Sequence, residues 1–209
     1  MDLWKFLDIL DSNKLYLSRA DTFEDKFEGR MPNKNIRNII GDDPLKNIDN
    51  FSNLSLNKST YIYCWSSEPN ETYPLWKIYS NYKSAIAIKS TVGDLIDSIS
   101  ENDGSQYIGS INYVNQDVNY IFRGNTYQLF FEKRNYFLFE KEIRLLSELP
   151  YHDHIELLKL PLGITLNVDY KKLIKEIYLA PLANESFKTL IELKLKDLNL
   201  DVKVSFSNI

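Results

Sequence analysis

The sequence predicts a single α+β domain with a mainly antiparallel or mixed sheet and several short helices. Segments of alternating polarity, typical of strands, are interspersed with segments whose apolar residues recur every three or four positions, typical of helices. The two kinds do not alternate strictly, as they would in a parallel βαβ fold. Neither an internal repeat nor a linker-like tract divides the 209 residues, so one domain is expected over residues 1–209.

The expected elements follow from these patterns in chain order. Leu3, Phe6 and Leu10 share one face of a first helix, which a strand over 15–18 follows. Pro74 suits the start of a helix over 75–82, and Thr91 with Asp94 resembles a capping box. Other strands are expected over 60–65, 84–90, 107–114, 137–146, 163–168, 176–180 and 201–206, and other helices over 36–40, 91–99, 125–135 and 184–198.

Composition and charge restrict the possible partners. The chain is 44% hydrophobic and 13% aromatic, which indicates a folded protein. With 25 basic and 29 acidic residues the net charge is -4, which disfavours binding to duplex nucleic acid and favours a small ligand over a polyanion. A small nucleotide-like ligand is one candidate. No apolar run approaches the roughly 20 residues of a membrane-spanning helix. No membrane partner is therefore expected.

The single cysteine and the N-terminus bear on the compartment. Cys64 cannot form an internal disulfide, and the first ten residues carry acids where a secretory signal carries bases. A cytoplasmic protein is expected. Cys64 lies in an apolar strand-like run without an evident basic neighbour, so we expect it to be structural.

Four sequence blocks carry most of the polar and aromatic residues that could form a site. They are F-x-D-x-F-E (Phe23, Asp25, Phe27, Glu28), C-W-S (Cys64, Trp65, Ser66), L-W-x-x-Y-S (Leu75, Trp76, Tyr79, Ser80) and K-R-x-x-F-x-x-E-x-E-x-R (Lys133, Arg134, Phe137, Glu140, Glu142, Arg144). In this order, and after an aromatic strand that ends in Ser18, they resemble the bacterial family called domain of unknown function 2971, over nearly the whole chain. Members usually carry Pro where this chain has Lys26, and many begin with a strand that is missing before Met1. If that strand supplies part of a site, a trimmed or inactive version is expected.

Glu140 and Glu142 are the candidate catalytic residues. In a strand over 137–146 they share one face with Arg144, while Phe139 and Ile143 lie on the opposite, buried face. The acidic face is then expected to meet solvent or a cleft. The alternative is that these charges merely pair across strands on a wet face.

The candidate ligand-binding residues lie near the ends of the predicted elements. Trp76 and Tyr79 form a stripe on a short helix and could stack on a ring, although such stripes are often core. Arginine suits two-point contact with phosphate or carboxylate, although each basic residue could also be a solvated surface charge. The full set is Ser18, Arg19, Ser66, Trp76, Tyr79, Lys133, Arg134 and Arg144.

No metal site is predicted. His152 and His154 are the only histidines, and no third ligand follows at a metal-binding spacing. A nuclease would need clustered acids, for which only Asp25, Glu28, Glu140 and Glu142 are candidates.

The order of these residues suggests a function by analogy of layout. A basic residue near an early strand, an aromatic strand-to-helix element and a later glutamate are similar to ADP-ribosyltransferases and related NAD-cleaving toxins. By this analogy Ser18 or Arg19 holds a nicotinamide dinucleotide, which is a substrate and not a cofactor, and Glu142 or Glu140 steadies the sugar cation. A bacterial toxin or phage-defence protein is then expected. The alternative is a non-catalytic nucleotide- or partner-binding module. In either case the C-W-S, L-W-x-x-Y-S and E-x-E-x-R blocks are expected to meet around one concave site.

Overall fold

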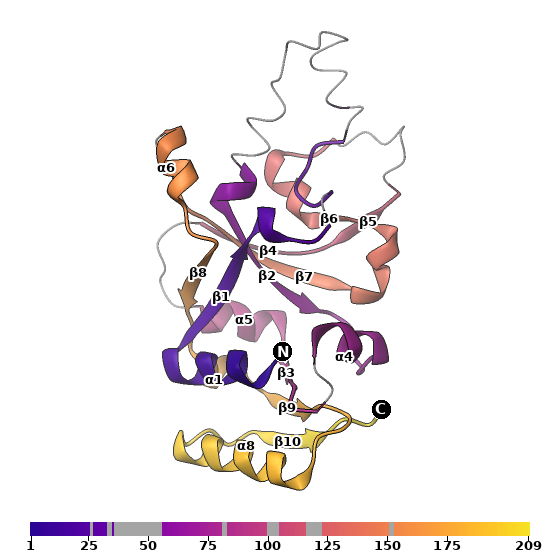
Figure 1. Ribbon diagram of the computed structural model, residues 1–209, viewed down its shortest axis with the longest axis vertical. Coiled ribbons are helices and arrows are strands. Elements are labelled where there is room, and N and C mark those ends of the chain that lie inside the picture. Colours follow the sequence, from indigo (N-terminus) through magenta and orange to yellow (C-terminus); the bar gives the residue numbers. More distant parts are fainter. Residues whose placement is uncertain are drawn as a thin grey trace. The chain divides into compact units, whose positions relative to one another are not determined.

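The computed structural model describes residues 1–25, 27–32, 35, 56–80, 83–99, 105–115, 123–150 and 153–209. These residues group into two compact units that interleave along the chain (Figure 1). The first unit comprises Met1–Leu15, Glu68–Asn102 and Thr165–Ile209, and the second comprises Tyr16–Ser67 and Asp103–Ile164.

A five-stranded sheet lies mainly in the second unit. Its strand order is β4 (Gln106–Ser110), β7 (Glu142–Glu148), β2 (Thr60–Ser66), β1 (Lys14–Arg19) and β8 (Gly163–Asn167). The pairs β1–β2, β2–β7 and β4–β7 are antiparallel. Arg144 on β7 lies opposite both Cys64 on β2 and Gly109 on β4, so these three residues share one face of the sheet.

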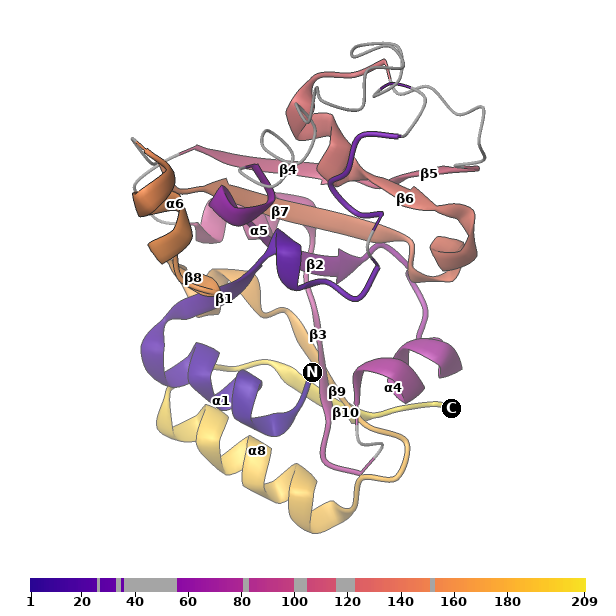
Figure 2. The ribbon, with the colours of Figure 1, turned by 45° about the horizontal axis from the view of Figure 1, so that its top comes forward.

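Short 3-10 turns and two short strands cover that face. η2 (Thr126–Phe131), β6 (Glu132–Arg134) and η3 (Asn135–Glu140) follow one another directly, and β5 (Asn112–Val114) pairs with β6 in parallel. Figure 2 shows the strands β4, β5, β6 and β7 of this part of the unit. Phe130 on η2 packs on Ile62 and Leu146 of the sheet and on Ala20 of η1 (Ala20–Thr22). α6 (His154–Lys159) completes the unit.

The first unit contains a mixed sheet of three strands. β9 (Glu176–Leu179) lies between β10 (Lys203–Phe206), which is parallel to it, and β3 (Ile86–Lys89), which is antiparallel. The helices are α1 (Leu3–Ser12), α4 (Tyr73–Tyr79), α5 (Val92–Ser98), α7 (Tyr170–Leu173) and α8 (Glu185–Asp197). The side chain of Thr91 caps α5 at the backbone amide of Asp94, as expected. No described helix is both long enough and apolar enough to span a membrane.

The α+β class with antiparallel and mixed sheets is confirmed. The expectation of one domain over residues 1–209 stays a prediction. Two expected elements are wrong in detail: the strand over 107–114 is divided into β4 and β5, and the helix over 125–135 is a 3-10 turn followed by β6. The helix expected over 36–40 lies outside the described residues.

The strand expected over 137–146 begins only at Glu142, because residues 135–140 form η3 and Lys141 has a positive φ of 42°. In a 3-10 helix residues three apart lie on one side. Phe137 and Glu140 therefore face inward, while Tyr136, Leu138 and Phe139 are exposed. The predicted burial of Phe139 is wrong, because this segment is a 3-10 helix and not a strand. The apolar residues at 137 and 139 match the two-residue period of a strand only by coincidence.

Candidate functional site

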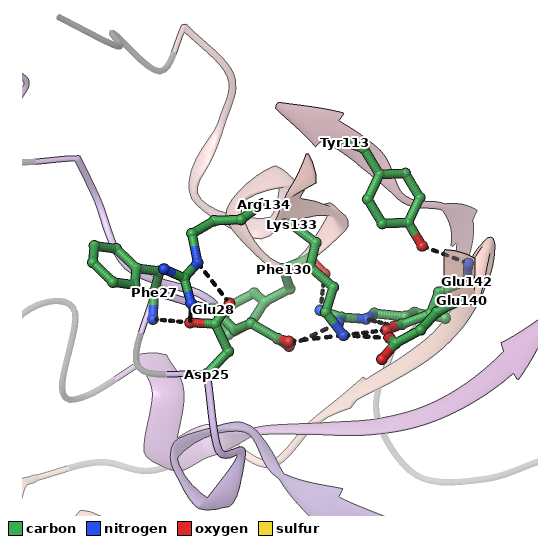
Figure 3. A network of polar contacts seen from close by, with 10 residues as sticks. Asp25, Phe27, Glu28, Tyr113, Phe130, Lys133, Arg134, Glu140 and Glu142 are labelled. Atoms are coloured by element: carbon green, nitrogen blue, oxygen red, sulfur yellow. Dashed lines mark hydrogen bonds and ion pairs between the residues drawn. The ribbon is translucent and has the colours of Figure 1, made fainter. Parts of the chain in front are cut away.

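Five charged side chains form a buried cluster in the second unit. They come from the turn after η1, from β6 and η3, and from β7 (Figure 3). The members of the charged cluster, each 1–8% exposed, are Glu28, Lys133, Glu140, Glu142 and Arg144. Buried charges are rare unless they are paired, so the geometry of the pairs decides what this cluster can do.

Lys133 joins the three carboxylates. Its Nζ lies 2.5 Å from Glu140 Oε2, 2.5 Å from Glu142 Oε1 and 3.2 Å from Glu28 Oε1. It also lies 4.5 Å from the centre of the Phe137 ring. The ammonium is therefore surrounded by three acids and one aromatic face.

Arg144 binds two of the same carboxylates through different nitrogens. Its Nε donates to Glu142 Oε2 at 2.6 Å and its Nη2 donates to Glu28 Oε2 at 2.7 Å. Its Nη1 donates to the Phe130 carbonyl at 2.8 Å. Glu28 and Glu142 thus each bridge Lys133 and Arg144, which closes a ring of charge-assisted contacts.

The surroundings of the two candidate catalytic acids shift their pKa values in opposite directions. Burial and a hydrogen bond with Glu142 raise the pKa of Glu140 to about 7, against the pull of Lys133. Burial opposes ionisation of Glu142 too, but the hydrogen bond from Glu140, together with Arg144 and Lys133, holds the Glu142 pKa well below its ordinary value. With Glu140 protonated, the two other carboxylates balance Lys133 and Arg144. Near neutral pH one acid is thus ionised and its neighbour can exchange a proton.

Beside the cluster lies a second, more accessible ion pair. Arg134 Nε and Nη2 donate to Asp25 Oδ2 and Oδ1 at 3.2 and 3.0 Å. Asp25 also accepts the backbone N–H of Phe27 at 3.0 Å, which fixes the turn that carries Glu28. The consecutive bases Lys133 and Arg134 therefore bind acids three residues apart, so the F-x-D-x-F-E and K-R blocks face each other in space.

Comparison with known proteins gives no match. No family model fits the chain, and neither a curated protein nor a solved structure was found to be similar to it. The resemblance to the domain of unknown function 2971 family therefore stays a prediction.

The structure brings together four of the ten predicted site residues in the cluster, namely Glu140, Glu142, Lys133 and Arg144. Arg134 lies next to them in the chain. The Ser66 hydroxyl donates to the Glu140 backbone carbonyl at 2.8 Å, which places it at the edge of the cluster. The acidic face was expected to meet solvent or a cleft. The first alternative, solvent, is wrong, because this face of β7 is covered by Lys133 and Glu28.

Ser18 and Arg19 lie on β1, which β2 separates from β7 in the sheet. Ser18 pairs with Ile62 and Arg19 with Tyr61 across the β1–β2 ladder, so their side chains point to opposite faces. Arg19 binds Asp21 at 2.7 Å and donates to the Leu160 carbonyl at 2.6 Å. These contacts hold the end of β1 to the chain before β8.

Trp76 and Tyr79 belong to α4 of the first unit. Trp76 is 5% exposed and packs against Ala85 and Ala180, and its indole N–H donates to Glu71 at 2.9 Å. Tyr79 is exposed. Trp76 is thus a core residue with a satisfied polar atom, as its alternative interpretation had it. The meeting of this helix with the charged cluster stays a prediction.

Cys64 has a basic neighbour after all, because it lies opposite Arg144 in the β2–β7 ladder. Desolvation and the nearby carboxylates of Glu142 and Glu28 outweigh Arg144 and raise the pKa of the Cys64 thiol to about 12. The thiol is therefore protonated at neutral pH, as expected for a cysteine that is not a nucleophile.

Tyr113 is a member of the site that no sequence signal indicated. Its hydroxyl accepts the backbone N–H of Glu142 at 2.8 Å (Figure 3). It reaches Glu142 only because β5 pairs in parallel with β6, a pairing without a local sequence signature. Among the described residues, no group of three or more His, Cys, Asp and Glu side chains is arranged to hold a metal ion.

Proposed function

We propose that this protein cleaves the bond between ribose and nicotinamide in a nicotinamide dinucleotide, as an ADP-ribosyltransferase-like or NAD-cleaving enzyme. The supporting observation is the pair of carboxyl groups, Glu140 and Glu142, which share Lys133 and whose pKa values are shifted in opposite directions. Glycosidic chemistry uses two neighbouring carboxyls of different pKa, one that stays ionised and one that exchanges a proton. A role as a toxin or in phage defence belongs to this proposal, because loss of the dinucleotide would harm the cell.

The proposed reaction assigns one task to each acid. When the glycosidic bond breaks, its electron pair leaves with the nicotinamide nitrogen and positive charge develops at the ribose C1′. Glu142, held ionised by Lys133 and Arg144, stabilises that charge. The acceptor hydroxyl, from water or a target, then bonds to C1′ and passes its proton to the deprotonated Glu140.

One observation favours a second candidate, a non-catalytic nucleotide- or partner-binding module. Both oxygens of Glu142 already accept from Lys133 and Arg144, and the side chain is almost fully buried. A carboxylate that is saturated in this way also suits a purely structural role. Turnover separates the two candidates.

The test is release of free nicotinamide from dinucleotide labelled in the nicotinamide ring, with cell lysate present to supply acceptors. We expect release by the native protein, with a rate that rises with pH through about 7 as Glu140 loses its proton. Glu140→Gln keeps the shape of the protonated side chain, so we expect it to fold and to lose activity by about 100-fold or more.

Glu176→Gln is the matched control, since Glu176 pairs with Lys89 in the first unit and is expected to leave turnover unchanged. Absence of nicotinamide release by folded native protein at every pH, with dinucleotide still bound, would leave the binding module as the function.

A further inference from the structure

A cation flanked by exposed aromatic rings lies beside the charged cluster. The guanidinium carbon of Arg134 is 4.4 Å from the centre of the Phe27 ring and 5.6 Å from that of Tyr136. Phe27 is 50% exposed and Tyr136 80% exposed, so neither ring serves the core. Large aromatic residues gathered in contact with water are typical of binding surfaces. Phe27, Arg134 and Tyr136 are called the arginine–aromatic surface below.

The arginine of this surface is fixed in orientation. Asp25 holds its Nε and Nη2, and the Phe27 ring lies against the guanidinium (Figure 3). In the part of the chain that the structure describes, no acceptor is bonded to the third nitrogen, Nη1. A donor that is already oriented binds an anion with less loss of side-chain entropy.

The charges around Arg134 allow an anion to approach. Among the described residues, the ion pair of Arg134 and the charged cluster contain the carboxylates Asp25, Glu28 and Glu142 and the cations Lys133, Arg134 and Arg144, beside Glu140. These opposite charges are equal in number. With Glu140 protonated, these ion-paired groups therefore add no excess of negative charge beside Nη1.

We propose that the arginine–aromatic surface binds a nucleoside monophosphate, with the phosphate on Arg134 and the planar base stacked on Tyr136. Arginine supplies planar, charged recognition of phosphate, and every nucleobase has a face that stacks on an aromatic ring. This inference rests on the proposed function only for the choice of ligand. The ligand chosen is adenosine monophosphate, because it is one half of a nicotinamide dinucleotide.

The test is calorimetric titration of the full chain with adenosine monophosphate, with adenosine and with inorganic phosphate. We expect the nucleotide to bind more tightly than either part alone. Tyr136→Ala should weaken nucleotide binding by about fivefold or more and leave phosphate binding unchanged, because a base stacked on an aromatic ring is lost. Since Tyr136 is largely exposed, this variant is expected to fold.

Arg134→Met should remove the advantage of the nucleotide over adenosine. Because it also leaves the buried Asp25 carboxylate without its arginine, its fold is checked by circular dichroism, and Arg134→Lys, which keeps the charge but not the planar fork, is measured beside it. The matched control is Lys188→Met, which removes a cation 5.4 Å from the Phe206 ring in the first unit and should have no effect.

Two results would overturn the inference: no binding of adenosine monophosphate at millimolar concentration, or equal binding by the native protein, Tyr136→Ala and the Arg134 variants. Either result could accompany nicotinamide release, in which case the proposed function stands without this surface. Binding that Tyr136→Ala weakens, without any nicotinamide release, supports the inference and rejects the enzymatic function.

Discussion

At the scale of single residues, the structure gives Glu142 a role in stability as well as a candidate role in catalysis. A catalytic carboxylate is expected to add little to stability, so as a candidate catalytic residue Glu142 could be replaced by Gln with the melting temperature nearly unchanged. In the structure Glu142 is buried and bridges Lys133 and Arg144. Loss of its charge leaves two buried cations undercompensated, which is costly. Glu140 is therefore the better residue for separating catalysis from folding.

The pH dependence of stability tests the assignment of the proton to Glu140. Its pKa is raised from 4.5 to about 7 in the folded protein, so the folded state keeps a proton that the unfolded chain loses. This contribution to stability is complete below about pH 4.5 and is lost as the pH rises through about 7. Glu140→Gln keeps the neutral form at every pH. We therefore expect it to match the native protein near pH 5 and to melt at least about 3 °C higher near pH 8.

The measurement is a set of thermal melts between about pH 5 and pH 8. Glu176→Gln serves as the control, because the pKa of Glu176 is lowered and its loss cannot stabilise the protein at high pH. Melting curves of Glu140→Gln and the native protein that shift in parallel over this range would show that Glu140 does not hold the proton.

At the scale of elements, the tight turn that carries Glu28 depends on Gly29. Its φ is +65°, and an added Cβ would lie 2.4 Å from Phe130 Cε1 and 2.6 Å from Asn57 Oδ1. Gly29→Ala should therefore destabilise the protein by about 2 kcal/mol or more, through backbone strain and overpacking. The measurement is chemical denaturation followed by fluorescence.

Gly93→Ala is the matched control for that substitution. Gly93 lies in α5, and its nearest neighbour is the Thr91 hydroxyl at an ordinary 3.7 Å. Alanine there should stabilise the helix by about 0.5–1 kcal/mol. Equal effects of the two substitutions would mean that Gly29 is not tightly confined.

The elements also show how far sequence patterns reach. Strands β2 and β9 and helix α8 were predictable because each has one dominant period and clear flanking signals. Residues 135–140 were not, because apolar side chains at 136–139 fit both a strand and a 3-10 turn, and burial of Glu140 by Lys133 decides between them. The acids and bases of the site could be picked out from their sequence blocks. The pairing of Arg134 with Asp25 and of Arg144 with Glu28 could not, since each pair joins residues more than 100 positions apart.

At the scale of the whole molecule, charge is used differently in the two units. In the second unit Lys133 is buried among three acids, whereas in the first unit Lys194 binds Asp11 at 2.6 Å on the surface. Lys133→Met should destabilise the protein by about 3–5 kcal/mol, because buried acids lose their cation. Lys194→Met should cost about 0–1 kcal/mol.

Salt distinguishes the two kinds of pair further. Surface pairs are screened by salt, and buried pairs much less. In chemical denaturation at low and at about 1 M sodium chloride, the effect of Lys133→Met should persist while that of Lys194→Met disappears. Loss of both effects in high salt would mean that water reaches the charged cluster.

The contact between Glu28 and Arg144 spans 116 positions of the chain, and this has a consequence for biosynthesis. At translation rates of about 5–20 residues per second, Arg144 is added about 6–23 seconds after Glu28. Lys133 follows Glu28 almost as late. During that interval the acids of the early turn have neither of their cations, and water must solvate them. The nascent turn therefore stays hydrated on the ribosome, and the second unit can close only after β7 has been made.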